Sequence, residues 1–255
     1  MHALWPIALN TFREARRNRV FYSILLFAVL LILFSVLFTE VTFVAQDRIL
    51  RDVGFATINL FGVGMAIFLG IGMVNREIER KTIYTVISKP VPRWAFVVGK
   101  DLGLLLTVGA TVGLMFGGFL LTLLSYRSPI EWVLLQPLYT LFLELAVLTA
   151  FAVFCSTWTS SALSAFLTAG LFVIGHFAQD IRDFGARSQT EMIRLGSSLL
   201  YHALPDLERF NLKHAVAYLK PVPLTDLGLL TVYATLWSAV FLLAAIWVFR
   251  QRDLR

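Results

Sequence analysis

Two ionisable side chains lie inside long segments that are otherwise apolar and uncharged. Glu144 is the only acidic or basic residue of segment 132–158, and His176 is the only one of segment 159–179. A charged group in hydrocarbon is costly and usually faces protein or water. Glu144 could bind a cationic group, relay protons or hydrogen-bond to another helix in its neutral form, and we favour this last, structural role. His176 could be a protonation site, but a hydrogen-bonded histidine near the end of its segment is the favoured interpretation.

No catalytic motif accompanies these two residues. The phosphate-binding pattern G-x-x-x-x-G-K-[ST] is absent, because Gly99–Lys100 is followed by Asp101. The zinc-protease pattern H-E-x-x-H is also absent, and the outer histidines His202 and His214 lack metal-type spacing. The single Cys155 excludes an intrachain disulfide and a cysteine-rich metal site. We therefore expect a protein that is not an enzyme and binds no cofactor or metal of its own.

The composition indicates that the chain is surrounded by lipid. Hydrophobic residues make up 58% of the 255 residues and charged residues only 15%, against about 25% charged residues in ordinary soluble proteins. The mean hydropathy is +0.77. The net charge of +6 could suggest nucleic acid, but the basic residues sit in short segments between apolar runs and form no basic domain. The predicted surrounding is the bilayer, with no nucleic-acid partner.

Six apolar runs are long enough to cross a membrane as helices, which need about 20 residues each. Barrel strands would be about 10 residues long and would alternate polar with apolar residues, unlike these runs. A cleaved signal peptide is disfavoured, because Phe38, Thr39 and Glu40 follow the first run in place of small residues. The sequence thus predicts an all-α integral membrane fold as a single domain, 1–255. Its six spans cover about 20–39, 55–75, 102–126, 133–157, 160–179 and 227–249.

The positive charges predict the orientation. Lys and Arg are enriched in cytoplasmic loops, and short segments carry most of this signal. The arm 1–19, the segment 76–100 and the tail after the last span fall on one side and contain thirteen basic residues. The short segments of the opposite side contain three, namely Arg48, Arg51 and Arg127. We therefore expect both termini in the cytoplasm.

The arm 1–19 is predicted to form an interfacial helix. An apolar stripe runs along one face of it, with an arginine cluster at its boundary. The alternative is a basic topogenic signal without a stable helix. The stripe consists of Leu4, Ile7, Ala8, Phe12 and Ala15.

The segment 76–100 combines a charged face, an apolar edge and a proline turn. Glu77 and Lys81 have the i,i+4 spacing that stabilises a helix. Pro90 and Pro92 should end this helix and start the next one. We interpret the segment as a docking surface for another protein; a helix hairpin without a partner is the alternative. The apolar edge consists of Ile83, Tyr84 and Ile87.

The segment 180–226 is expected to be an extracytoplasmic loop that contains short helices. Apolar stripes at helical spacing cover about 192–204. Pro205 interrupts them, and Asp206 could cap a second helix through Tyr218. The sequence leaves open whether these helices dip into the outer leaflet or form an external polar cap.

Small residues at four-residue spacing mark two helix contacts, because they let helix backbones approach closely. We expect packing within the chain for at least one of the two stripes, while the other could form a dimer seam or the wall of a conduit. The second span carries Gly62, Ala66 and Gly70, and the third carries Gly109, Gly113 and Gly117.

Taken together, the arm, the six spans and two polar motifs resemble the permeases of ABC-2 type transporters over essentially the whole chain. The motifs are NREIERKTIYTVISKPVPRW, after the second span, and LPDLERFNLK, before the sixth. The closest resemblance is to the branch named for multicopper enzyme maturation. The resemblance implies a type V exporter-like transmembrane domain in the bacterial cytoplasmic membrane, and a second permease, identical or related.

The resemblance also implies a separate ATPase subunit, which would hold the ATP and Mg. Its coupling element would be the helix after the second span, and the second and fifth spans would line the path around 60–72 and 162–175. Closure of the ATPase dimer would then drive either export or mechanical work on the membrane. The coupling residues would be Glu77, Glu79, Arg80, Ile83, Tyr84, Ile87, Pro90, Arg93 and Trp94.

Two other functions remain open at this point. One is an ion-coupled secondary transporter that uses Glu144 and His176. The other is a membrane scaffold or assembly factor without an ATPase partner. The transported substrate and the direction of transport do not follow from the sequence.

Overall fold

The computed structural model describes most of the chain as helix. Within the described residues there is no strand, which confirms the predicted all-α fold. The predicted first span, 20–39, lies largely outside the described residues. The described ranges are 4–17, 21–22, 25–26, 28–30, 46–79, 92–188, 190–212 and 221–251, and for 71–79 only the backbone is described.

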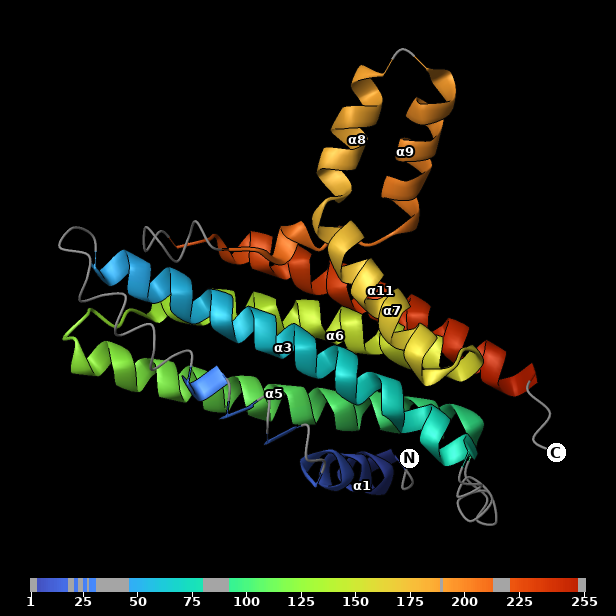
Figure 1. Cartoon of the computed structure of the whole chain (residues 1–255), viewed down its shortest axis with the longest axis horizontal. Coiled ribbons are helices and arrows are strands. Elements are labelled where there is room, and N and C mark those ends of the chain that lie inside the picture. The colour runs from blue at the N-terminus through green and yellow to red at the C-terminus, as the bar shows by residue number, and fades with distance from the viewer. Residues whose placement is uncertain are drawn as a thin grey trace.

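Four long helices run side by side and form the body of the molecule (Figure 1). Each is long and apolar enough to cross a membrane. Helices α3 and α11 extend beyond both ends of the predicted spans, and α5 begins earlier than predicted, because polar residues at the ends of the apolar runs continue the helical backbone. They are α3 (Gln46–Glu79), α5 (Arg93–Ser125), α6 (Leu135–Trp158), which follows the 3-10 turn η1 (Trp132–Leu134), and α11 (Leu224–Gln251).

Helix α6 is the centre of this body. It contacts α3, α5, α7 and α11, and 67% of its most apolar stretch is buried, against 17% for α11. A helix that is apolar on all sides belongs in a core or in lipid, and these two helices illustrate both cases. The outward face of α11 is therefore the face that we expect lipid to cover.

The predicted fifth span is shorter than expected. Helix α7 (Ser161–His176) has 16 residues, about 24 Å at 1.5 Å per residue, which is less than the roughly 30 Å of a hydrocarbon core. It bends by 59° into α8 (Ala178–Arg187). The described residues thus hold four spans, or five if this bent pair counts as one, and the count of six stays a prediction.

Helices α8 and α9 (Glu191–Ala203) form a hairpin that leaves the side of the bundle (Figure 1). The predicted helix from Asp206 to Tyr218 is wrong over 206–212, where the structure has only the short turn η2 (Glu208–Phe210). The cause is tertiary packing: Leu207 and Phe210 are buried, and the Leu207 amide donates to the Gly175 carbonyl at 3.0 Å. Residues 213–220 lie outside the described part.

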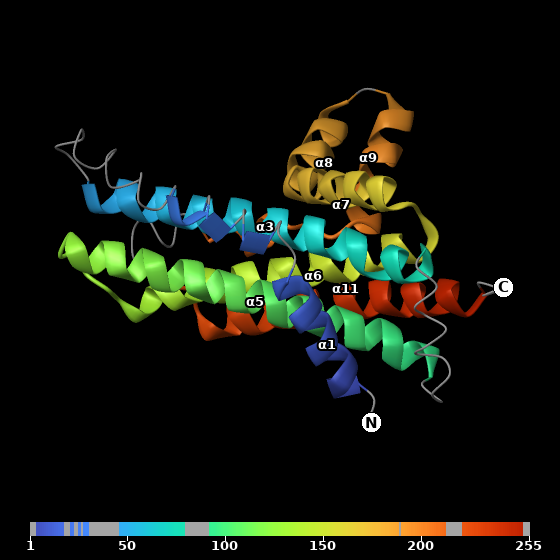
Figure 2. The ribbon, with the colours of Figure 1, turned by 60° about the horizontal axis from the view of Figure 1, so that its bottom comes forward.

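Helix α1 (Leu4–Arg16) lies across α5 (Figure 2). The predicted stripe is the face turned towards the protein: Ala8 and Ala15 are fully buried, and Leu4, Ile7 and Phe12 are partly buried. Outside this stripe, Trp5 is exposed. The arm thus packs on a membrane-spanning helix, in addition to having the amphipathic pattern of an interfacial one.

Candidate functional site

The first region of interest is the end of the bundle where α3 finishes and α5 begins, which we call the α1 end. Arg93, the first residue of α5, donates from Nη1 to the carbonyl oxygens of Phe249 at 3.3 Å and Arg250 at 2.8 Å. The last carbonyls of a helix have no partner within the helix and attract a cation. The ring of Phe96 stacks on that of Phe249, with centroids 5.7 Å apart. The beginning of α5 is thus fastened to the end of α11.

A pair of glycines lets α1 approach α5 closely. A Cβ added to Gly103 would lie 2.5 Å from the Thr11 Cβ and 2.6 Å from the Ala8 carbonyl oxygen. A Cβ at Gly99 would lie 2.8 Å from the Cγ2 of Ile7. Only glycine fits at such distances.

A buried charge strengthens this contact. Lys100 is only 1% exposed, and its Nζ lies 3.7 Å from the Oε2 of Glu14 in α1. The same ammonium lies 5.8 Å from the centre of the Phe96 ring. Lys100 therefore connects α1 to the same aromatic pair that holds α11.

The predicted coupling residues lie at the end of α3, at the start of α5 and in the stretch between them, most of which the structure does not describe. Glu77 and Glu79 lie in the last turns of α3, where only the backbone is described, and Arg93 and Trp94 open α5. Trp94 is 39% exposed. Arg80, Ile83, Tyr84, Ile87 and Pro90 lie outside the described residues, so their predicted docking role stays a prediction.

The two glycine stripes differ. The stripe on α3 faces the core: Ala66 is fully buried, a Cβ at Gly62 would lie 3.1 Å from Leu145, and one at Gly70 would lie 2.5 Å from the Ala152 Cβ. It serves packing within the chain.

The stripe on α5 faces outwards over most of its length. A Cβ at Gly109 would meet the Phe142 ring at 3.0 Å, whereas nothing lies within 4 Å of one at Gly113 or Gly117. No other described residue therefore covers the small-residue surface at these two glycines.

The second region is a polar cluster inside the bundle, and it brings together the two ionisable residues singled out in the sequence. Glu144, on α6, is 1% exposed. Its Oε1 lies 3.6 Å from Nε2 of His176, at the end of α7, and its Oε2 accepts a hydrogen bond of 3.3 Å from the amide of Asn59 on α3. Three helices thus meet at one carboxylate.

The segment after the hairpin closes the cluster. The Oε2 of Glu208 lies 3.9 Å from His176 Nε2, and Glu208 Oε1 accepts from the side-chain amide of Asn211 at 2.7 Å. The other ring nitrogen of His176 lies 3.0 Å from the Phe172 carbonyl, which fixes the plane of the imidazole. His176 is thus placed between two carboxylates from different elements.

Asp206 anchors the same segment from its other side. Its Oδ2 accepts from Gln179 at 2.9 Å and from Arg209 at 3.0 Å, and its backbone amide donates to the Tyr233 hydroxyl at 2.7 Å. Hydrogen bonds to Asp206 and Tyr201 raise the pKa of the Arg209 guanidinium. Because its carboxylate is used for tertiary contacts, Asp206 does not cap the helix that the sequence suggested.

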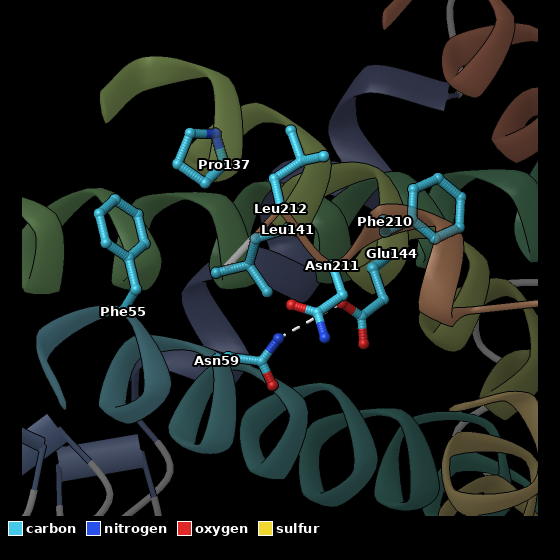
Figure 3. Close-up of a pocket in the computed structure, with 8 residues that line it drawn as sticks. All are labelled: Phe55, Asn59, Pro137, Leu141, Glu144, Phe210, Asn211 and Leu212. Carbon is cyan, nitrogen blue, oxygen red and sulfur yellow. Dashed lines mark hydrogen bonds between the residues drawn. The ribbon is translucent and has the colours of Figure 1, made fainter. Parts of the chain in front are cut away.

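A small pocket opens beside Glu144 (Figure 3). Its cavity volume is about 30 Å³, and the side chains of Asn59, Glu144 and Asn211 form its polar part. Figure 3 shows these three side chains turned towards one another. The apolar part consists of Phe55, Pro137, Leu141, Phe210 and Leu212.

The chemistry of this pocket is binding and proton exchange. It contains a carboxylate, an adjacent imidazole and two amides, but no nucleophile–base pair or oxyanion site. The described residues also contain no group of three or more His, Cys, Asp or Glu side chains placed to hold a metal ion. The arrangement is suited to a cationic group or a proton.

Several of these residues carry no charge to mark them in the sequence. Asn59 is one of them, although a lone amide in an apolar run is itself a signal. Gly99 and Gly103 have the same four-residue spacing as the two predicted glycine stripes. Gly99 lies before the predicted third span, and Gly103 lies at its start. The structure adds that the guanidinium of Arg93, a predicted coupling residue, holds the end of α11, and its coupling role stays a prediction.

Four long apolar helices with α6 at their centre define a multi-pass α-helical membrane protein. The chain belongs to the ABC-2 family of transporter proteins, whose family model matches residues 5–254. This match confirms the family resemblance found in the sequence, whereas the multicopper-maturation branch stays a prediction. No curated protein matches the chain.

Proposed function

We propose that this protein is the permease subunit of an ABC-2 type transporter and that a separate ATPase subunit drives it. The observation that carries the proposal is the family match across residues 5–254, in a chain whose sequence has no phosphate-binding loop. ATP and Mg would bind to the partner, and a second permease, identical or related, would complete the transporter. The outcome of ATP hydrolysis would be export or mechanical work on the membrane.

The proposed location is the bacterial cytoplasmic membrane, with both termini and the α1 end in the cytoplasm. The charge bias of the short segments supports this orientation. Reporter fusions at Lys89 and Arg255 should read cytoplasmic, whereas fusions at Arg48 and Arg187 should read outside. If Lys89 and Arg187 report the same side, the six-span topology is wrong.

The geometry of the α1 end supports a role in coupling. The proposed docking segment lies between the end of α3 and the start of α5, and Arg93 and Phe96 fasten that start to α11. A force on the segment would therefore act on helices that are in contact with one another. A domain motion in the partner needs such rigid contacts to reach the membrane-spanning helices.

The decisive experiment is to purify the permease with its ATPase and to measure partner retention, ATP hydrolysis and transport together. Charge reversal of Glu77 and Glu79, or alanine at both Ile83 and Tyr84, should weaken ATPase binding or uncouple hydrolysis from transport. Charge reversal of Glu191, exposed on the hairpin, is the matched control and should leave all three measurements unchanged. Wild-type values in both coupling variants would remove this segment from the mechanism.

A second candidate function rests on the Glu144–His176 contact of 3.6 Å, because paired ionisable groups inside a membrane are typical of proton relays. In this alternative the protein is an ion-coupled secondary transporter. Transport in vesicles that carry a proton gradient but no ATP would support it. Transport that needs ATP and persists after an uncoupler would exclude it.

A further inference from the structure

A second pocket lies between the start of α11 and the segment that follows the hairpin. Its cavity volume is about 350 Å³, within the range of about 300–1,000 Å³ that is typical of small-ligand pockets. Because the last turn of α11 lies at the α1 end, the start of this helix and the pocket lie at the opposite end of the bundle. The topology proposed above places this end on the outer side of the membrane.

The side chain of Arg209 gives the pocket a fixed hydrogen-bond donor. Its Nε donates to Asp206 at 3.0 Å, and its Nη2 donates to the Tyr201 hydroxyl at 3.1 Å. The guanidinium also lies 5.2 Å from the centre of the Tyr233 ring. Its Nη1 has no hydrogen-bond partner among the described residues. The pairing with Asp206 offsets part of the positive charge, so Arg209 contributes mainly the direction of its free donors, which suit phosphate oxygens.

The side chain of Asp226 gives the same pocket an acceptor. Asp226 lies in the first turn of α11, and its carboxylate is exposed. Within the described residues, this carboxylate accepts one hydrogen bond, from the neighbouring Thr225 hydroxyl at 3.5 Å. No ion pair joins Arg209 to Asp226 in the part of the chain that the structure describes. The pocket therefore suits a ligand that has an anionic group and a separate cationic group.

The apolar wall of the pocket continues onto the face of α11 that we expect lipid to cover. Leu229 lines the pocket and is 69% exposed. Val232, one turn further along the helix, is also exposed. A ligand with a polar head in the pocket can therefore place its apolar part along α11. The other apolar lining residues are Leu212, Val222 and Leu230.

Aromatic residues place the pocket near the surface of the membrane. The Tyr139 hydroxyl lies 2.8 Å from the Thr231 hydroxyl, and Thr231 lies in the same turn of α11 as the lining residue Leu230. Tyr139 is exposed, as is Trp132 just before α6. Tyrosine and tryptophan are enriched at the interfaces between membrane and water. The pocket is thus at the depth of the lipid headgroups.

We propose that this pocket binds the headgroup of one phosphatidylethanolamine molecule, with the phosphate at Arg209 and the ammonium at Asp226. The acyl chains lie along the exposed side of α11. The proposal rests on the membrane location and on the outward position of this end, but not on the ATPase. Binding is measured on this chain alone, so it can fail while the transporter function holds, and the reverse.

The first test compares lipid headgroups. The full-length chain in a non-ionic detergent is titrated with phosphatidylethanolamine, phosphatidylcholine and phosphatidylglycerol that carry the same acyl chains, and native mass spectrometry counts the one-to-one complexes. Phosphatidylethanolamine should bind at least about threefold more tightly, because choline has no N–H donor for Asp226 and glycerol has no cation. Equal binding of the three lipids, or tighter binding of either of the others, would overturn the proposal.

The second test separates a lipid from a soluble zwitterion. Glycerophosphoethanolamine has the same charged groups but no acyl chains, and calorimetry measures its binding to the same preparation. It should bind at least about tenfold more weakly than the lipid, because the apolar wall then has no partner. Equal affinities would show that the occupant is a soluble molecule, and the lipid proposal would be wrong.

Matched variants test the position of the site. Asp226→Asn should remove the preference for phosphatidylethanolamine over phosphatidylglycerol, whereas Asp183→Asn, on the exposed surface of α8, should leave it unchanged. Leu229→Trp fills the pocket and should weaken the binding of phosphatidylethanolamine. Leu236→Trp is its control, because Leu236 is exposed on the same face seven residues further along. If either variant behaves like its control, the lipid does not bind in this pocket.

Discussion

The α1 end and the Glu144 cluster both hold charged side chains, but they hold them in different ways. At the α1 end, Arg93 binds backbone carbonyls of α11, and the glycines of α5 bring α1 into direct contact with the helix. In the Glu144 cluster, side chains from several elements hold one another. Backbone contacts move only with their helices, whereas side-chain contacts can be exchanged one at a time.

This difference separates two tasks that a transporter has to perform. A region that passes on motion should be stiff, and close packing of helices provides this stiffness. A region that binds and releases a ligand needs groups whose partners change, and a polar cluster with a cavity beside it has them. The comparison therefore leads to different expectations for mutations at the two places.

The largest effect is expected from Gly103→Ala at the α1 end. The new methyl group would meet the Ala8 carbonyl and the Thr11 Cβ at 2.5–2.6 Å, and backbone cannot move aside as a side chain can. We expect a loss of about 2 kcal/mol in stability, as for overpacked cores, and detachment of α1. Unfolding in a denaturant series, together with proteolysis of the arm, measures both effects.

Gly113→Ala is the control for this prediction. Gly113 lies on the same helix and has nothing within 4 Å of an added Cβ, so the substitution should be neutral or slightly stabilising through helix propensity. If Gly103→Ala is as harmless as Gly113→Ala, α1 is not held by close packing, and the stiffness assigned to the α1 end is wrong.

A smaller effect is expected at Glu144. Glu144→Leu removes the acceptor for Asn59 and one of the partners of His176, and leaving the half-buried Asn59 amide without its acceptor costs about 1 kcal/mol. Glu144→Gln retains hydrogen bonding and should lose little stability. Thermal unfolding of the two variants measures the difference. If Gln abolishes transport while expression and assembly stay normal, the charge itself is needed, and the structural role favoured from the sequence is insufficient.

The sequence was sufficient for the parts of the fold that depend on local pattern. Apolar length located α3, α5, α6 and α11, because hydrocarbon allows few other structures. It also singled out Glu144 and His176, because a lone charge in an apolar run stands out. That these two side chains meet depends on the packing of α7 against α6, which no local spacing encodes.

The same limit explains the errors. Asp206 had the right residue type and position for a helix cap, but Gln179 and Arg209 compete successfully for its carboxylate. The contact of Arg93 with the end of α11, 157 residues away in the sequence, is likewise invisible in the local pattern, and the predicted coupling role of Arg93 stays a prediction. Glycine spacing marks a close approach on α3, whereas no described residue lies near a Cβ at Gly113 or Gly117 on α5. The sequence does not tell which stripe meets which helix.

Arg93→Gln is expected to cause the smallest change in stability. It is also the most informative test of the comparison between the two regions. One of the two hydrogen bonds is exposed, so solvent replaces part of what is lost, and the cost should be about 0.5–1 kcal/mol. The functional cost should be larger than this value suggests, because the start of α5 would no longer be fastened to α11. In the purified complex, we expect ATP hydrolysis to continue while transport falls.

Arg93→Lys keeps a cation near the last carbonyls and should recover part of the coupling. Arg194→Gln removes an exposed guanidinium on the hairpin helix α9 and should leave the ratio of transport to hydrolysis unchanged. If Arg93→Gln and Arg194→Gln leave that ratio equally unaffected, the contact between α5 and α11 serves only to hold the fold, and the force must pass through another helix.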